Sequence, residues 1–181
     1  MSSVTKSVLV SSTLIVLTNL SYSTFNALLA NPNMGTYLEA QGYTPLFNAK
    51  KEGFTKWKRN YLIYKDELRQ LIPELEDSDK HGGFLLKQWC RVRLNQPFSK
   101  ENYYYFDLTK KYCTMNIQNT ILEEDDIRTI DEIPIEKQKE LFNNPEQLLS
   151  QCKDWFRIPY TYQNYELFTK TKKTCATKNW I

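Results

Sequence analysis

The chain contains the same pattern twice, at a constant separation of 62 positions. Cys90 falls on Cys152 and Cys113 falls on Cys175, and no gap is needed between them. Both cysteines, a proline and several aromatic residues recur while most polar positions differ, which is typical of a repeated structural unit. The repeat therefore predicts two related units in one chain. Further identical pairs in this stretch include Pro97 and Pro159, Asn102 and Asn164, Tyr103 and Tyr165, Phe106 and Phe168, Lys110 and Lys172, and Lys111 and Lys173.

The four cysteines allow three disulfide pairings. If both units fold alike, the repeat favours the bridges Cys90–Cys113 and Cys152–Cys175, each of which would stabilise its unit by about 3 kcal/mol on the chain-entropy model. The alternative is four reduced cysteines that pack as small apolar groups, as expected in a cytosol. The sequence does not favour a zinc site, because it has no CxxC motif and only one histidine, His81.

The first 30 residues differ from the rest, since Lys6 is their only charge and apolar runs follow it at 8–10 and 14–17. A short positive region, an apolar stretch and a small-x-small site at Ser21-Tyr22-Ser23 are typical of a secretory signal peptide, and an uncleaved segment would serve as a membrane anchor. The alternative is an N-terminal helix of a cytosolic protein. We expect a signal peptide or membrane anchor at 1–30, and a location at the cell membrane or the extracellular surface.

The remaining chain predicts an all-α, predominantly helical fold. Residues 31–53 begin with the breaker sequence Asn-Pro-Asn-Met-Gly and show no clean period, so we expect a linker there. From Phe54 onward apolar residues recur every three or four positions as far as Pro73, which predicts one amphipathic helix. This helix would open unit 1, residues 54–116.

Two helical hairpins complete the expected units. In unit 1 a helix over 84–95 ends before Pro97, and a second helix follows that begins at Ser99 or Asn102 and runs to the second cysteine. Unit 2, residues 117–181, would begin with a short helix over 134–142. Its own hairpin follows, with Asn144 as cap and Pro145 at the first helical position. Each expected bridge would join the two helices of one hairpin.

No motif in the sequence points to catalysis. The chain has no GxSxG, Walker, HExxH or dinucleotide-binding motif, and His81 stands in a glycine-rich turn. The acidic run at 123–126 lacks the spacing and central glycine of a calcium-binding loop. We therefore expect a protein that is not an enzyme and has no cofactor and no metal site.

Tyrosines and lysines cluster in both repeats and are the candidate binding residues. In one interpretation some of the tyrosines pack the hairpin and the others form an amphipathic rim that suits a protein partner. In the other they stack on bases or sugars beside cations, as in a binding module for nucleic acid or glycosaminoglycan. The net charge of +3 is too small to indicate nucleic acid by itself. The candidate residues are Tyr103, Tyr104, Tyr105, Lys110, Lys111, Lys172 and Lys173.

Several short segments of unit 1 resemble a known group of sequences. They are Trp57-Lys58 with Tyr61 and Asp66, the run Leu-Lys-Gln-Trp-Cys at 86–90, and the run Leu-Thr-Lys-Lys-Tyr-Cys-Thr-Met-Asn at 108–116. Over residues 54–120 the chain resembles the large paralogous families of haemotropic mycoplasma proteins. Unit 2 departs from this pattern, since Gln151 stands where those families have tryptophan. The resemblance implies a surface-displayed paralogue, so we expect a non-enzymatic exported or membrane-anchored protein that contacts an unknown protein partner.

Overall fold

The computed structural model describes residues 32–50, 53–72 and 81–177. The expected all-α class is confirmed, since helices dominate the described chain and only one two-stranded antiparallel pairing accompanies them. The expected signal or anchor segment, 1–30, lies outside the described residues. The helices are α2 (Met34–Ala40), α3 (Phe54–Leu71), α4 (Gly82–Asn95), α5 (Tyr103–Cys113), α6 (Ile117–Ile121), α7 (Ile135–Leu141), α8 (Pro145–Phe156) and α9 (Tyr165–Cys175), with strands β1 (Arg128–Thr129) and β2 (Ala176–Thr177).

Both expected disulfides are confirmed, and each joins the two helices of a hairpin. Cys90 of α4 pairs with Cys113 of α5, and their Cα atoms lie 5.5 Å apart. Cys152 of α8 pairs with Cys175 of α9, with a Cα separation of 5.8 Å. All four cysteines are fully buried, so each bridge lies within the core of its own hairpin. The hairpin is therefore the structural unit that the repeat encodes.

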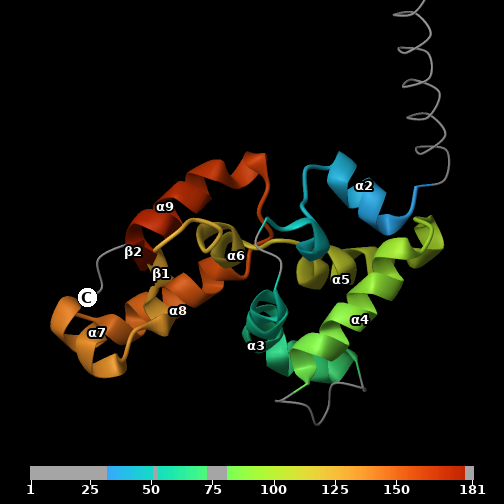
Figure 1. Ribbon diagram of the computed structural model, residues 1–181. Helices are drawn as coiled ribbons and strands as arrows, with labels where there is room; N and C mark the ends of the chain where they lie inside the picture. The colour runs from blue at the N-terminus through green and yellow to red at the C-terminus, as the bar shows by residue number, and fades with distance from the viewer. Residues whose placement is uncertain (1–31, 51–52, 73–80, 178–181) are drawn as a thin grey trace, which may run out of the picture.

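The buried apolar residues form two separate clusters. One cluster contains α2, α3, α4 and α5 and the other contains α6, α8 and α9, and the boundary falls between Met115 and Ile117. We call described residues 32–115 unit 1 and residues 116–177 unit 2. In Figure 1 the two hairpins lie on opposite sides of α3, with α4 and α5 to one side and α8 and α9 to the other.

The structural repeat begins well before the cysteine hairpins. Asn33 caps α2 by accepting a hydrogen bond from the Thr36 N–H, and Asn116 caps α6 in the same way from the Asn119 N–H. Each capping asparagine also pairs with the proline of its hairpin, in the isolated antiparallel bridges Asn33–Pro97 and Asn116–Pro159. The short helices α2 and α6 are therefore equivalent, at a spacing of 83 positions rather than 62.

A second pairing repeats at the other end of each hairpin. In unit 1 Pro45 pairs with Thr114, and in unit 2 Thr129 pairs with Ala176 within the β1–β2 ladder. A turn of 3₁₀ helix follows in both places, with Leu46 or Ile130 fully buried. The expected linker at 31–53 is therefore wrong for its described residues, because α2 and this turn bury apolar side chains in the core of unit 1 and belong to the repeat.

The two units differ mainly in one helix. Unit 1 has the 18-residue α3 between its 3₁₀ turn and its hairpin, whereas unit 2 has the 7-residue α7 at that place. The backbones of α3 and α4 approach closely at Gly83. A Cβ atom built on this residue would lie only 2.6 Å from the Lys58 backbone nitrogen. Glycine is therefore required for this helix crossing. No such crossing exists in unit 2, where Pro145 stands at the equivalent position.

Two expected helix caps differ in detail from the sequence prediction. Asn102 does not cap α5 through its side chain, and its Nδ2 donates instead to the Pro97 carbonyl at 3.1 Å. Asn164 makes the same bond to the Pro159 carbonyl at 2.8 Å, which explains why this asparagine recurs. Asn144 makes no side-chain cap either and donates to the Gln147 side chain. Pro145 does take the first helical position of α8.

Candidate functional site

Helix α3 joins the two units through a buried asparagine. Asn60 is fully buried on the same side of α3 as Tyr61 and Tyr64. Its Nδ2 donates to the Tyr112 carbonyl of unit 1 at 2.6 Å. Its Oδ1 accepts from the side chains of Asn116 at 2.9 Å and Asn119 at 3.1 Å, both in unit 2. One amide thus bonds both units, and we call this contact between α3 and unit 2 the joint.

Ion pairs surround the joint. Lys56, which is only 8% exposed, pairs with Glu123, and Arg59 pairs with Glu132 at 3.1 Å. Both cations come from α3 and both carboxylates come from unit 2. Partly buried pairs are screened less by salt than surface pairs. The joint is therefore complementary in charge as well as in hydrogen bonding.

A second polar cluster sits at the end of the joint that faces α5. The Tyr64 hydroxyl donates to the Arg157 carbonyl, and burial raises the pKa of Tyr64. Glu67 accepts from Lys111 and from the Tyr112 hydroxyl, and Arg157 lies 3.7 Å from it. Burial works toward a higher pKa for Glu67, but these donors and positive charges outweigh it and lower the pKa. The pKa of Tyr112 is raised by burial and by the charge of Glu67.

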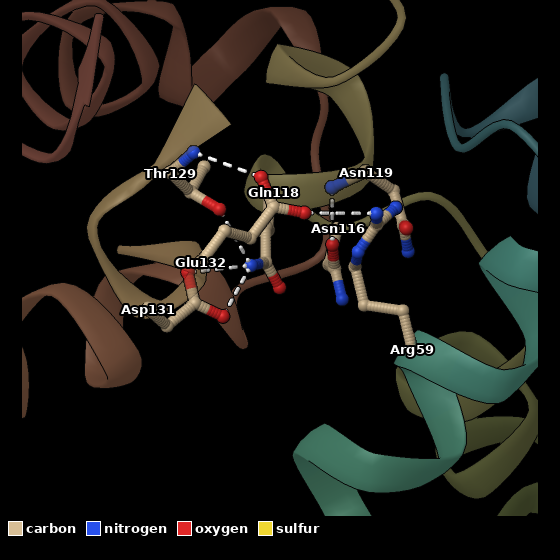
Figure 2. Close-up of polar contacts among 7 residues, drawn as sticks. All are labelled: Arg59, Asn116, Gln118, Asn119, Thr129, Asp131 and Glu132. Atoms are coloured by element: carbon tan, nitrogen blue, oxygen red, sulfur yellow. Dashed lines mark hydrogen bonds and ion pairs between the residues drawn. The ribbon is translucent and has the colours of Figure 1, made fainter. Parts of the chain in front are cut away.

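The loop of unit 2 that faces α3 is held by its own hydrogen bonds, as Figure 2 shows. The Gln118 Nε2 donates to both Asp131 oxygens, at 2.8 and 3.0 Å, and to the Thr129 hydroxyl at 3.1 Å. The Glu132 carboxylate accepts from the Thr129 N–H at 3.2 Å and also receives Arg59. These bonds fix the 3₁₀ turn and the Gln118 amide beside the joint.

A cleft of about 500 Å³ opens at the joint, and we call it the joint cleft. One wall is the face of α3 that begins at Thr55, and the other wall comes from α6, the 3₁₀ turn and α8 of unit 2. Its lining combines apolar side chains with four cations and two carboxylates. The lining residues are Thr55, Lys58, Arg59, Leu62, Ile63, Asp66, Gln118, Asp131, Lys153, Phe156 and Arg157.

A second cleft, of about 410 Å³, occupies the equivalent place in unit 1, and we call it the unit 1 groove. The structural repeat relates its residues to those of the joint cleft, with Gly35 at the place of Gln118 and Phe47 at the place of Asp131. No helix comparable to α3 contributes to its lining. The lining residues are Asn33, Gly35, Thr36, Glu39, Pro45, Phe47, Asn48, Arg91, Leu94 and Asn95.

The tyrosines expected to form a binding surface are exposed at the start of α5. Tyr103, Tyr104 and Tyr105 are 55%, 60% and 38% exposed. The Arg93 guanidinium covers part of the Tyr105 ring in a cation–π contact, 3.8 Å from the ring centre. The repeat equivalent of Tyr103 is Tyr165, which is 56% exposed, and both rings lie 6.0 Å from the buried or half-buried phenylalanine of their hairpin. Tyr162, which is not among the candidate residues, is 85% exposed, more than any other tyrosine in the part of the chain that the structure describes.

Three of the four candidate lysines have carboxylate partners. Lys110 pairs with Asp107 at 2.7 Å, Lys111 pairs with Glu67, and Lys172 pairs with Glu124. Burial works against the charged form of Lys110, but the Asp107 carboxylate outweighs it and raises the pKa. Lys173 is exposed. The structure thus places the lysines around the hairpins as separate pairs and does not gather them with the tyrosines into one basic surface.

The sequence reasoning missed the joint and both clefts. The signal that could have revealed the joint was Asn60, a polar residue within the apolar stripe of α3 beside Trp57 and Tyr61. Buried polar side chains are normally hydrogen-bonded, so such a residue indicates a partner. The clefts had no comparable signal, because their walls come from segments far apart in the chain.

Within residues 32–50, 53–72 and 81–177, no group of three or more histidine, cysteine, aspartate or glutamate side chains is arranged to hold a metal ion. In the same part of the chain no helix is both long and apolar enough to cross a bilayer. No protein-family model, curated protein or solved structure matches the chain.

Proposed function

We propose that the protein is a non-enzymatic, exported or membrane-anchored protein, displayed at the cell surface, that binds a protein partner through its exposed tyrosines. The observation that carries this proposal is the exposure of tyrosines at the start of the second hairpin helix in both units, with Tyr162 exposed most. Tyrosine is enriched at protein interfaces because it combines a large apolar ring with a polar hydroxyl. The buried disulfides hold the hairpins that present these rings.

The cysteine chemistry supports the proposed compartment. All four cysteines are paired in two disulfides, and none of them is free. Disulfides persist in oxidising environments and are rare in reducing cytosols. The resemblance to surface-displayed paralogues and the apolar sequence of residues 1–30 favour the same location.

A protein partner fits the exposed surface better than a polyanion does. Binding to nucleic acid or to a glycosaminoglycan draws on cations that are free to neutralise phosphates or sulfates. Lys110, Lys111 and Lys172 already face carboxylates of this chain. Tyr103, Tyr104, Tyr162 and Tyr165, by contrast, are each more than half exposed and are available for packing against another protein.

Surface display is tested by labelling intact cells of the source with a membrane-impermeant biotin reagent. We expect the protein to be labelled on intact cells as strongly as after lysis. Labelling that appears only after lysis would contradict the location.

Partner binding is tested separately by photo-crosslinking on the intact cell surface. A photoreactive amino acid placed at Tyr162 should yield a discrete crosslinked partner. The matched control places it at Glu140, an exposed residue of α7, a helix that carries none of these tyrosines. Equal crosslinking from both positions, or none from either, would contradict an interface centred on this tyrosine.

A further inference from the structure

The joint cleft has the size and composition of a small-molecule site. Its volume of about 500 Å³ lies within the range of roughly 300–1,000 Å³ that is usual for ligand pockets. Leu62, which is 50% exposed, and the half-buried Ile63 give the α3 wall an apolar part, and Phe156, only 1% exposed, contributes to the opposite wall. The remaining lining is polar or charged and comes from both units. The cleft therefore offers an apolar surface together with groups that would orient a ligand.

Positive charge is available at the rim of the joint cleft. Lys58 and Lys153 are exposed side chains from opposite walls, and neither makes an ion pair with any described residue. Arg59 and Arg157 add two further cations, which are held in place by Glu132 and Glu67. The lining also contains two carboxylates, Asp66 and Asp131, so with Glu132 and Glu67 four carboxylates stand beside four cations. Because Lys58 and Lys153 have no carboxylate partner among the described residues, these two ammonium groups at the rim are the ones that favour a negatively charged group of a ligand.

The wall of the cleft also contains an acceptor without a donor. The Gln118 side chain is fully buried, and its nitrogen is fixed by Asp131 and Thr129. Its oxygen must therefore point the other way, and Figure 2 shows it directed away from Asp131. This oxygen has no hydrogen-bond partner among the described residues. Because an unpaired buried acceptor costs about 1–3 kcal/mol, the site favours a ligand that brings a donor.

The equivalent groove of unit 1 lacks these features, although it has a similar shape. Gly35 replaces the glutamine, Phe47 replaces Asp131, and Asn95 replaces Arg157. The lining of the unit 1 groove contains one cation, Arg91, which is equivalent to Lys153 in the repeat, and one carboxylate, Glu39. The hairpin fold by itself therefore creates a groove, and the charged and hydrogen-bonding groups are specific to the joint cleft.

We propose that the joint cleft binds a small amino- or hydroxy-carboxylate with an apolar side chain. The carboxylate lies between Lys58 and Lys153, the amino or hydroxyl group donates to the Gln118 oxygen, and the apolar part packs on Leu62 and Ile63. This assignment goes beyond the proposed partner binding, since it concerns a different surface from the exposed tyrosines. The unit 1 groove does not bind this class of ligand.

The test titrates the full chain, labelled with ¹⁵N, with four matched compounds at up to roughly 10 mM, ten times a millimolar Kd. L-phenylalanine and L-phenyllactate carry both groups, 3-phenylpropanoate lacks the donor, and 2-phenylethylamine lacks the carboxylate. We expect the first two to shift the side-chain amide signals of Gln118. The compound without a donor should bind roughly three- to tenfold more weakly, which corresponds to the loss of one hydrogen bond.

Two variants at equivalent repeat positions separate the joint cleft from the unit 1 groove. Lys153→Glu should weaken binding of phenylalanine and phenyllactate by roughly tenfold, because it reverses a charge beside the carboxylate. Arg91→Glu, the matched control in unit 1, should leave their affinity unchanged. Both positions are exposed, so both variants are expected to fold.

The proposal is overturned if none of the four compounds moves the Gln118 side-chain signals. It is also overturned if 2-phenylethylamine binds as tightly as phenylalanine, or if Arg91→Glu weakens binding as much as Lys153→Glu. None of these outcomes affects crosslinking from position 162, so the failure of this proposal is distinguishable from the failure of partner binding.

Discussion

Units 1 and 2 share a disulfide-bridged hairpin, a capped short helix and a 3₁₀ turn, but they differ in the segment between the turn and the hairpin. In unit 1 this segment forms α3, which packs on α4 and α5 and also reaches across to unit 2. In unit 2 it is the short α7, which packs on α8. The shared frame defines each unit, and the one helix that is not shared connects the two units.

The same difference distinguishes the two clefts. Both lie between a short capped helix, a 3₁₀ turn and the first hairpin helix. Only the cleft of unit 2 has a further wall, from α3, and only this cleft has a buried unpaired acceptor at its surface. The repeated fold therefore forms a similar groove in both units. The residues that differ between the two linings decide which groove fits a charged ligand.

The largest effect is expected from Asn60→Leu, which removes the amide that bonds both units. The Tyr112 carbonyl would lose its donor, and the side chains of Asn116 and Asn119 would lose their acceptor. With a cost of about 1–3 kcal/mol for each buried unpaired group, we expect a loss of about 4 kcal/mol in the free energy of unfolding, measured by denaturant titration. Unfolding should then split into two transitions.

The control for this variant is Asn95→Leu. Asn95 is exposed and bonds only within α4, so its replacement should change the stability by less than about 0.5 kcal/mol. A single cooperative transition in Asn60→Leu, with stability close to that of the parent chain, would show that the joint does not couple the units.

A smaller effect, about 3 kcal/mol, is expected from removing either disulfide by double alanine substitution. The two bridges span the same sequence separation of 23, so the chain-entropy loss is the same. The described core of unit 2 is smaller than that of unit 1. We therefore expect the loss of Cys152–Cys175 to expose α9 to hydrogen exchange while α4 remains protected.

The matched variant lacks Cys90 and Cys113. With the larger core of unit 1 still in place, α4 and α5 should keep measurable protection from exchange at neutral pH. If this variant instead loses protection throughout while the unit 2 variant stays fully protected, the order of stability that we assign to the units is wrong.

The smallest effect concerns Tyr64 and appears only at high pH. Burial raises the pKa of Tyr64 in the folded chain, whereas the unfolded side chain ionises near pH 10. Its contribution to stability is therefore complete below pH 10 and is lost as the pH rises above that value. Between pH 10 and 11 the free energy of unfolding of the wild type should fall by about 1 kcal/mol more than that of Tyr64→Phe, as measured by denaturant titration.

Tyr165→Phe serves as the control for the alkaline experiment. The Tyr165 ring is 56% exposed, so this variant removes a tyrosine hydroxyl that is not buried in the joint. If Tyr64→Phe lost stability with pH as steeply as the wild type, the Tyr64 hydroxyl would have to be accessible to solvent, and the joint would be looser than described here.

The hairpins and their bridges could be predicted from the sequence because they are local. The cysteines of each pair are 23 positions apart, and proline marks the end of the first helix in both copies. The apolar period from Phe54 likewise predicted α3 as far as Leu71. In each case the signal and the structure it describes lie within about 25 residues of one another.

The expected linker failed because its counterpart lies at a different spacing. Asn33 corresponds to Asn116 at 83 positions, and the difference from 62 arises because the segment of unit 1 that contains α3 is longer than the segment of unit 2 that contains α7. Apart from the capping asparagines, the two short helices share almost no residues. A search at constant spacing therefore finds the hairpins and misses α2 and α6.

The sequence by itself determined the helical class, the duplicated hairpin and the pairing of the four cysteines, since each of these depends on periods and spacings within a short stretch. The tertiary structure alone decided that α3 bonds to both units through Asn60 and that a cleft lies beside it. The physical reason is that those contacts join side chains more than 50 residues apart, whose burial and hydrogen bonding depend on the packing of both units and not on any local pattern.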